Sequence, residues 1–212
     1  MNLRQQLRAV APALWTVYAT LAAMVLGVVL AKYLAGVSTA DLVRDPAVVA
    51  GTHPFVGWLS NVGIVLWCST AAVCLFSAFI IRTRAGDRET RSFLLCAGLL
   101  TSLFLLDDFF LIHDEVFPRY LGVHENLFYG AYALLAVLFV FRFRELIRRS
   151  EFVLLVLALL MFALSIGADF LSSFVWFTGL LLFEDSLKLF GIAAWFLYFV
   201  RLCKTLVSRP GP

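Results

Sequence analysis

A run of acidic residues that includes one histidine closes the third apolar segment of the chain. Asp107 and Asp108 are followed by four apolar residues and then by His113, Asp114 and Glu115. On a regular helix, which turns 100° per residue, the four carboxylates lie within about 120° of one another, and His113 points elsewhere. Charged groups inside a membrane are costly and usually face the interior of a helix bundle, so we expect Asp107 and Asp108 to build a site. Asp114 and Glu115 fit a solvated helix end equally well.

The next apolar segment opens with a histidine and an acid, and these extend the set of metal-binding groups. Carboxylate oxygens and imidazole nitrogens are the ligands that zinc, manganese, iron and, with fewer histidines, calcium take from proteins. We therefore predict a divalent metal ion, of open identity, with ligands among Asp107, Asp108, His113, His124 and Glu125. The alternative for His124 and Glu125 is a helix cap, because an acid near a helix N-terminus is favourable. The spacing matches no known metal or hydrolase signature.

Acidic groups and one lysine lie at the ends of the last two apolar segments. Asp169 is near the end of the fifth segment, and Glu184, Asp185 and Lys188 open the sixth. Lys188 follows Asp185 by three residues and Glu184 by four, so the three share a helix face. We predict that Asp169 or Glu184 is a general base for metal-bound water and that Lys188 holds a phosphate or a developing oxyanion. A structural ion pair between Lys188 and a carboxylate is the alternative. The acids and the lysine lie at matching depths along their spans, so we predict that they converge in one outer-leaflet cavity: Asp107, Asp108, Asp169, Glu184, Asp185 and Lys188.

The composition shows what kind of molecule must position these groups. Hydrophobic residues make up 62% of the 212 residues, charged residues only 15%, and the mean hydropathy is +0.94. Soluble domains contain roughly 45–50% apolar residues, and a soluble domain of this size has no room to bury such an excess. Soluble, disordered and fibrous proteins are therefore excluded, and the sequence indicates a membrane protein.

Six apolar stretches qualify as spanning helices, which need roughly 20 residues, although the fourth is shorter. They are Val10–Leu34, Pro54–Ile81, Ser92–Ile112, Asn126–Phe141, Phe152–Ser172 and Leu180–Val200. The runs are continuous rather than alternating, which favours helices over a membrane β-barrel. We predict an all-α membrane protein, a six-transmembrane helix bundle that forms one polytopic domain over residues 1–212. Residues 35–53 are expected to form an extracytoplasmic flap, with Ser38 or Thr39 capping a short helix.

The distribution of charge predicts the orientation. With six spans, 13 of the 17 basic residues lie on the side of both termini, where the net charge is +9, against −6 on the other side. Basic loops stay in the cytoplasm, so we expect a multi-pass protein of the cell (inner) membrane with cytoplasmic N- and C-termini. These loops face anionic lipid headgroups, and no nucleic-acid partner is expected. None of the four cysteines falls in an extracytoplasmic loop, so no disulfide is expected.

The last four apolar segments resemble one another in pairs. Glu125–Asn126 and Glu184–Asp185 each open a segment, and an arginine follows each glutamate after 17 residues. The third and fourth spans and the fifth and sixth spans are therefore candidates for two related helical hairpins. Chance similarity between apolar helices is the alternative, because only a few residues match.

Three functions remain compatible with these patterns. The first is a metal-dependent hydrolase or transferase, embedded in the membrane, that acts on a lipid-linked substrate from the extracytoplasmic side. The second is a non-catalytic sensor or assembly subunit that binds a metal or a partner. The third is a cation or proton transporter, which is disfavoured because the inner halves of the last spans carry no polar route.

Overall fold

The structure is a computed structural model, and it describes residues 3–81, 88–172 and 178–208. Within these ranges every regular element is a helix. Five apolar helices are long enough to cross a membrane, and they cover Val10–Leu34, Trp58–Ile81, Arg88–Phe110, Phe152–Leu171 and Gly179–Val207. The predicted all-helical class is therefore confirmed over these ranges, and the five apolar helices are consistent with a membrane protein. The helix over Asn126–Arg142 is apolar but shorter, so a sixth span stays a prediction.

The chain divides into two compact units, residues 1–56 and 57–212. The first unit consists of a long helix and two short ones, α1 (Leu3–Ala35), α2 (Thr39–Val43) and α3 (Pro46–Ala50). The Ser38 hydroxyl accepts a hydrogen bond from the Ala40 N–H and so caps α2, which confirms the predicted short helix. α2 ends at Val43, and Pro46 is the first residue of α3, whose N-cap is Asp45.

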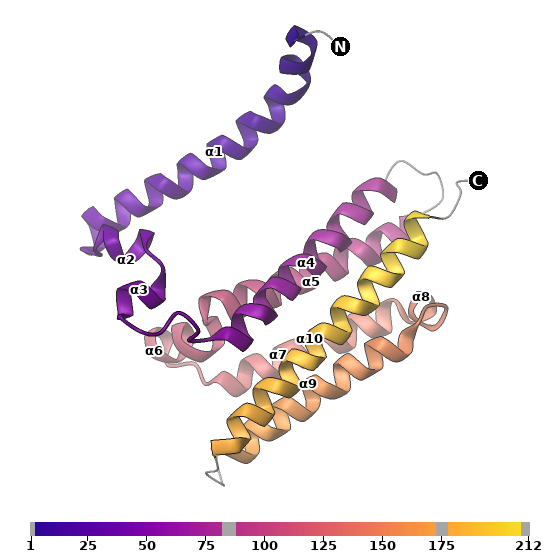
Figure 1. Ribbon diagram of the computed structural model, residues 1–212. Helices are drawn as coiled ribbons and strands as arrows, with labels where there is room; N and C mark the ends of the chain where they lie inside the picture. Colours follow the sequence, from indigo (N-terminus) through magenta and orange to yellow (C-terminus); the bar gives the residue numbers. More distant parts are fainter. Residues whose placement is uncertain (1–2, 82–87, 173–177, 209–212) are drawn as a thin grey trace. The chain divides into compact units, whose positions relative to one another are not determined.

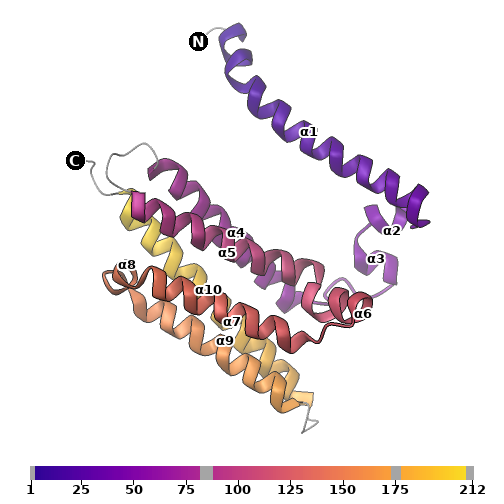
Figure 2. The same cartoon turned by 180° about the vertical axis from the view of Figure 1, so that it is seen from behind.

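In the described ranges of the second unit, 57–81, 88–172 and 178–208, five longer helices form a bundle with short helical turns between them. Its elements are α4 (Trp58–Ile81), α5 (Arg88–Phe110), η1 (Ile112–Val116), α6 (Phe117–Leu121), α7 (Glu125–Arg142), α8 (Arg144–Arg148), α9 (Phe152–Ser172) and α10 (Thr178–Val207). α10 packs along both α9 and α4, and α4 packs along α5 (Figure 1). α7 contacts the bundle through α5 and η1, and Figure 2 shows it between α5 and α9.

The bundle is most tightly packed near the end at which α8 lies. Its aromatic core is formed by Phe93, Phe139, Phe143, Trp195 and Phe199, all buried. The Phe93 ring stacks on Phe139 at 5.3 Å between centroids and meets Phe143 edge-on at 5.1 Å. Such offset and edge-to-face pairs are favourable for aromatic rings. These contacts hold the ends of α5, α7 and α10 together.

The structure does not confirm the pairing of two related hairpins. α5 packs mainly along α4, and only α9 and α10 form a closely packed pair within one proposed repeat. α7 begins at Glu125, whereas Glu184 lies inside α10, which begins earlier at Thr178. The repeat therefore remains a prediction.

Candidate functional site: an acidic cavity

A break in the helix after α5 brings His113 back toward Asp107. Leu111 adopts the left-handed conformation with φ of 50°, and residues 112–116 form a single π-helical turn, η1. This corrects the expectation from a regular helix, in which His113 points elsewhere. The left-handed conformation costs a leucine roughly 1–3 kcal/mol and persists only where surrounding contacts fix it. Here the contact is with Asp107, because its Oδ1 accepts the His113 backbone N–H at 3.1 Å.

The imidazole ring of His113 lies between two carboxylates. Its Nδ1 is 2.5 Å from Asp107 Oδ2, and its Nε2 is 3.0 Å from Asp114 Oδ1. Burial of the ring lowers the pKa of His113, but the hydrogen bonds and negative charges of the two aspartates outweigh this effect and raise the pKa to about 9. The hydrogen bond from His113 lowers the pKa of Asp114. His113 is therefore a cation at neutral pH.

Asp108 is held by donors from two other helices. Its Oδ2 accepts the indole N–H of Trp67 on α4 at 2.9 Å, and its Oδ1 accepts the ammonium of Lys188 on α10 at 2.8 Å. Asp108 is thus the point at which α4, α5 and α10 meet. The predicted ion pair between Lys188 and a carboxylate is confirmed.

These groups line one cavity of about 530 Å³, here called the acidic cavity. Its ionisable lining residues are Asp107, Asp108, His113, Asp114, Asp169, Glu184, Asp185 and Lys188. Acids from α5, η1, α9 and α10 therefore converge, as their similar positions along the spans predicted. The structure brings the three predicted catalytic groups, Asp169, Glu184 and Lys188, to the same space as three of the predicted metal ligands.

The cavity continues from the ionisable groups into an apolar crevice between α7 and α9. The crevice is lined by Ala133, Ala136, Val137, Val140 and Phe141 on α7 and by Leu159, Phe162, Ala163 and Ile166 on α9. Several of these side chains, among them Val137, Phe141 and Ile166, are exposed on the outer surface of the unit. The apolar part of the cavity is therefore bordered by side chains that also lie on the exposed surface of the unit.

Comparison with known proteins gives a family for the chain. A family model described as a domain of unknown function, DUF8692, matches residues 14–202. The chain belongs to DUF8692. No curated protein and no solved structure matches it. The DUF8692 match includes every residue that lines the acidic cavity.

Two predicted metal ligands of this DUF8692 chain stand apart from the others. His124 is the N-cap of α7, where its Nδ1 accepts the backbone N–H of Asn126. This is the capping role that the sequence left open, and His124 is not among the cavity-lining residues. Glu125 is the first residue of α7, and its side chain lies outside the described part of the chain.

The remaining three predicted ligands form a compact group. One ligand atom from each of Asp107, Asp108 and His113 lies within 4.8 Å of the others, and the donor set suits a divalent transition metal. However, both oxygens of Asp107 contact His113, and both oxygens of Asp108 accept hydrogen bonds from Trp67 and Lys188. Both ring nitrogens of His113 contact aspartates, so a metal ion bound by His113 must take one nitrogen away from Asp107 or Asp114.

Trp67 is the site residue that the sequence analysis missed. It lies in a continuous apolar run and is 41 residues from Asp108 along the chain. One signal was available, because an indole N–H buried in a membrane span needs an acceptor, and the run around Trp67 offers few. Within the next apolar stretch, Ser92–Ile112, the only carboxylates are Asp107 and Asp108.

Proposed function

We propose that this chain is a six-span membrane protein that takes an amphipathic, lipid-linked molecule from the bilayer into the acidic cavity. The observation that carries the proposal is the continuity of one space, whose polar end holds the ionisable groups and whose apolar end opens between α7 and α9. Ligand sites are usually apolar pockets with a few convergent polar groups. A molecule with a polar head and an apolar chain matches both ends.

In this proposal α7 is also a span, the fourth of six along the chain. Its apolar part, Asn126–Arg142, is about 25 Å long at 1.5 Å per residue, somewhat less than a hydrocarbon core of about 30 Å. Arg142 at its end reaches the headgroups by extending its side chain. With six spans the basic loops place both termini in the cytoplasm, and the acidic cavity then opens in the outer leaflet.

The reaction class that we propose is metal-assisted hydrolysis or group transfer. Asp107, Asp108 and His113 would supply the donor set, with the metal replacing a proton that His113 otherwise holds, and Asp169 or Glu184 is the general base. Lys188, whose ammonium is bound by Asp108, positions that carboxylate. Non-catalytic binding of the same molecule is the second candidate, and it is favoured by the protein donors that already occupy both oxygens of Asp107 and Asp108.

Quenching of tryptophan fluorescence tests entry of a lipid chain into the crevice. Trp67 and Trp195 line the cavity and are buried, so we replace Trp15, Trp58 and Trp176 with Phe to leave these two as reporters. In nanodiscs of phospholipid with brominated acyl chains, we expect the reporters to be quenched. Absence of quenching in this background contradicts the proposal.

A matched pair of variants on α7 locates the quenching. Ala136 lines the crevice, whereas its neighbour Leu135 does not. Ala136→Phe should fill the crevice and remove most of the quenching, and Leu135→Phe should leave it unchanged. If the tryptophan fluorescence of both variants is quenched as strongly as that of the parent, the lipid chain lies outside the crevice.

Metal content separates the enzyme from the binding protein. We expect the purified protein to hold about one divalent metal ion if it is a metal-dependent enzyme, and Asp108→Ala to lose it. A metal-free parent that still shows lipid quenching favours the non-catalytic candidate.

A further inference from the structure

Acidic side chains outnumber basic side chains in the lining of the acidic cavity. Six carboxylates line it, against two cationic side chains, His113 and Lys188. Both cations are already engaged, His113 by Asp107 and Asp114 and Lys188 by Asp108. Glu184 and Asp185 of α10 therefore add negative charge beyond what the described lining cations balance. Such an excess in a space of low polarity requires protonation, water or a bound cation.

Aromatic rings surround the same space. Those that line the cavity include Trp67, Phe104, Tyr129, Tyr132, Phe162 and Trp195. The faces of aromatic rings attract organic cations, most strongly where water is excluded. Carboxylates beside aromatic rings favour an ammonium group, and the carboxylates repel a phosphate or another carboxylate.

We propose that the molecule bound in the acidic cavity is a membrane amphiphile with a cationic amine head. This inference rests on the proposed function, which supplies the apolar chain and its route between α7 and α9. The amine lies among the carboxylates of α9 and α10, with Glu184 and Asp185 as its principal partners. Asp185 is exposed, so it meets the head at the mouth of the cavity, and Glu184 lies deeper. Lys188 remains bound to Asp108 and keeps that carboxylate in place.

The test compares amphiphiles that share one chain and differ in the head. Hexadecylamine, hexadecanol and hexadecanoate are titrated as a fraction of the lipid into phosphatidylcholine nanodiscs that hold the full chain, at pH 7. The fluorescence of Trp67 and Trp195 and the melting temperature report binding, because a ligand of the native state raises the melting temperature. We expect saturable binding of hexadecylamine at least tenfold tighter than of the other two. Equal binding of all three overturns the inference.

Two carboxylate variants and a matched control assign the head group to its partners. Asp185→Asn and Glu184→Gln should each weaken hexadecylamine binding about tenfold, the size expected for a hydrogen bond between charged groups. Glu145→Gln, on α8, should bind like the parent, because Glu145 pairs with Arg144 and Arg148 away from the cavity. Asp185 is exposed, so its variant is expected to fold, which circular dichroism checks. Parent-like binding by both cavity variants overturns the inference.

Two further ligands and the quenching experiment separate the ways of failing. Butylamine that binds as tightly as hexadecylamine overturns the membrane origin of the ligand. Zn²⁺ or Mn²⁺ that stabilises the protein and excludes hexadecylamine overturns the amine in favour of a metal. If brominated lipid quenches the reporters but the amine shows no preference, the proposed function stands and the inference alone fails. If quenching is absent, both fail.

Discussion

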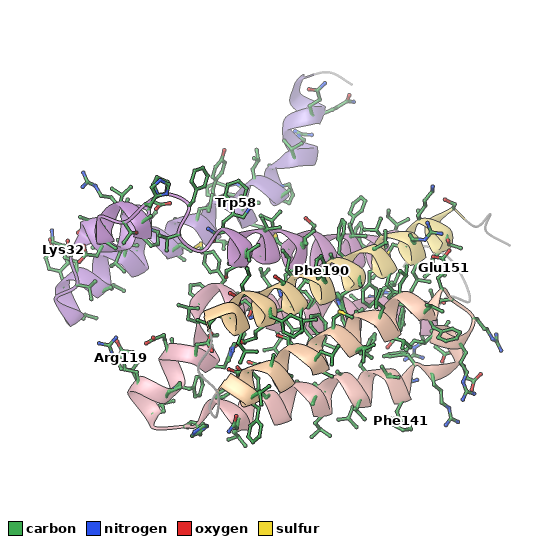
Figure 3. All side chains as sticks on the ribbon, turned by 60° about the horizontal axis from the view of Figure 1, so that its bottom comes forward. Lys32, Trp58, Arg119, Phe141, Glu151 and Phe190 are labelled. Carbon is green, nitrogen blue, oxygen red and sulfur yellow. The ribbon has the colours of Figure 1, made fainter. Side chains whose placement is uncertain are left out.

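The two ends of the helix bundle differ in packing: one is filled by aromatic rings, and the other surrounds the acidic cavity. At one end, aromatic rings fill the space between α5, α7 and α10, and Phe93 and Phe199 are almost completely buried. At the other end, ionisable groups from α5, η1, α9 and α10 surround about 530 Å³. Figure 3 shows Glu151 near the first end and Arg119 near the second. We call the end with the aromatic core the closed end and the end with the acidic cavity the open end. Packing at the closed end fixes the helices, so the open end can keep its cavity.

Small residues make the closed end possible. Cys74, Ala78, Ala97 and Ala158 are completely buried, and small side chains let helix backbones approach closely in membranes. The open end instead uses long polar side chains that reach across a gap, as Lys188 does to Asp108. The same helices therefore pack closely where their side chains are small and leave a cavity where their side chains are long and polar.

The largest loss of stability is expected when Asp108, at the open end, is replaced. Asp108→Ala leaves the ammonium of Lys188 and the indole of Trp67 without their acceptor. Removing one partner of a buried pair costs 3–5 kcal/mol. We expect about 3 kcal/mol here, because the Lys188 side chain is 42% exposed. Unfolding in detergent measures the loss.

A double variant shows whether that loss belongs to the ion pair. Asp108→Ala combined with Lys188→Met should recover much of the stability, because no unpaired charge remains. Lys188→Met alone should be destabilised at neutral pH and improve as the pH falls and carboxylates take up protons. Additive losses in the double variant, or a parent-like Lys188→Met between pH 5 and 8, contradict a structural pair.

The next largest effect is expected between α4 and α5 at the closed packing surface. A Cβ at Gly98 would lie 2.7 Å from the Leu75 side chain and 3.3 Å from its backbone nitrogen. Gly98→Ala should therefore cost about 2 kcal/mol by overpacking. Gly130→Ala on α7 is the control, because its Cβ meets no atom within 4 Å. It should be neutral or stabilising, since alanine is the better helix former. Equal effects of the two variants contradict the close contact.

The sequence predicted the apolar helices and the convergence of the acids because both depend on patterns that repeat along the chain. Apolar length predicts a span, and the cost of facing lipid predicts that Asp107, Asp169 and Glu184 point inward. The pairing of Lys188 followed from the same cost. These outcomes need no knowledge of how the helices cross.

The turn at Leu111 and the hydrogen bond from Trp67 depend on contacts between distant residues. Nothing in a leucine favours a left-handed conformation, so the turn is fixed by Asp107 and His113 after the helices pack. The crevice between α7 and α9 likewise depends on how α7 leaves the bundle. The sequence therefore predicts which residues gather but not the geometry in which they meet.

A smaller effect is expected in the pH dependence of the open end. The pKa of His113 is raised from 6.5 to about 9 in the folded protein. Its contribution to stability is therefore full below pH 6.5 and is lost as the pH rises through about 9. With a chelator present, the melting temperature of the parent should fall by a few degrees over this range. His113→Asn should flatten that dependence, and an unchanged slope contradicts a charged His113.

The smallest effect is expected for an ion pair near the closed end, and it isolates the role of burial. Glu151 accepts two hydrogen bonds from the guanidinium of Arg201, a more favourable geometry than the single bond between Lys188 and Asp108. These hydrogen bonds lower the pKa of Glu151, so the pair stabilises the fold at neutral pH and loses that effect as the pH falls below about 4.5. However, both side chains are more than half exposed, and water and salt screen exposed pairs. Glu151→Gln should therefore melt within about 2 °C of the parent at pH 7 in 0.15 M salt. A loss as large as that of Asp108→Ala would show that bond geometry rather than burial sets the strength of the two pairs.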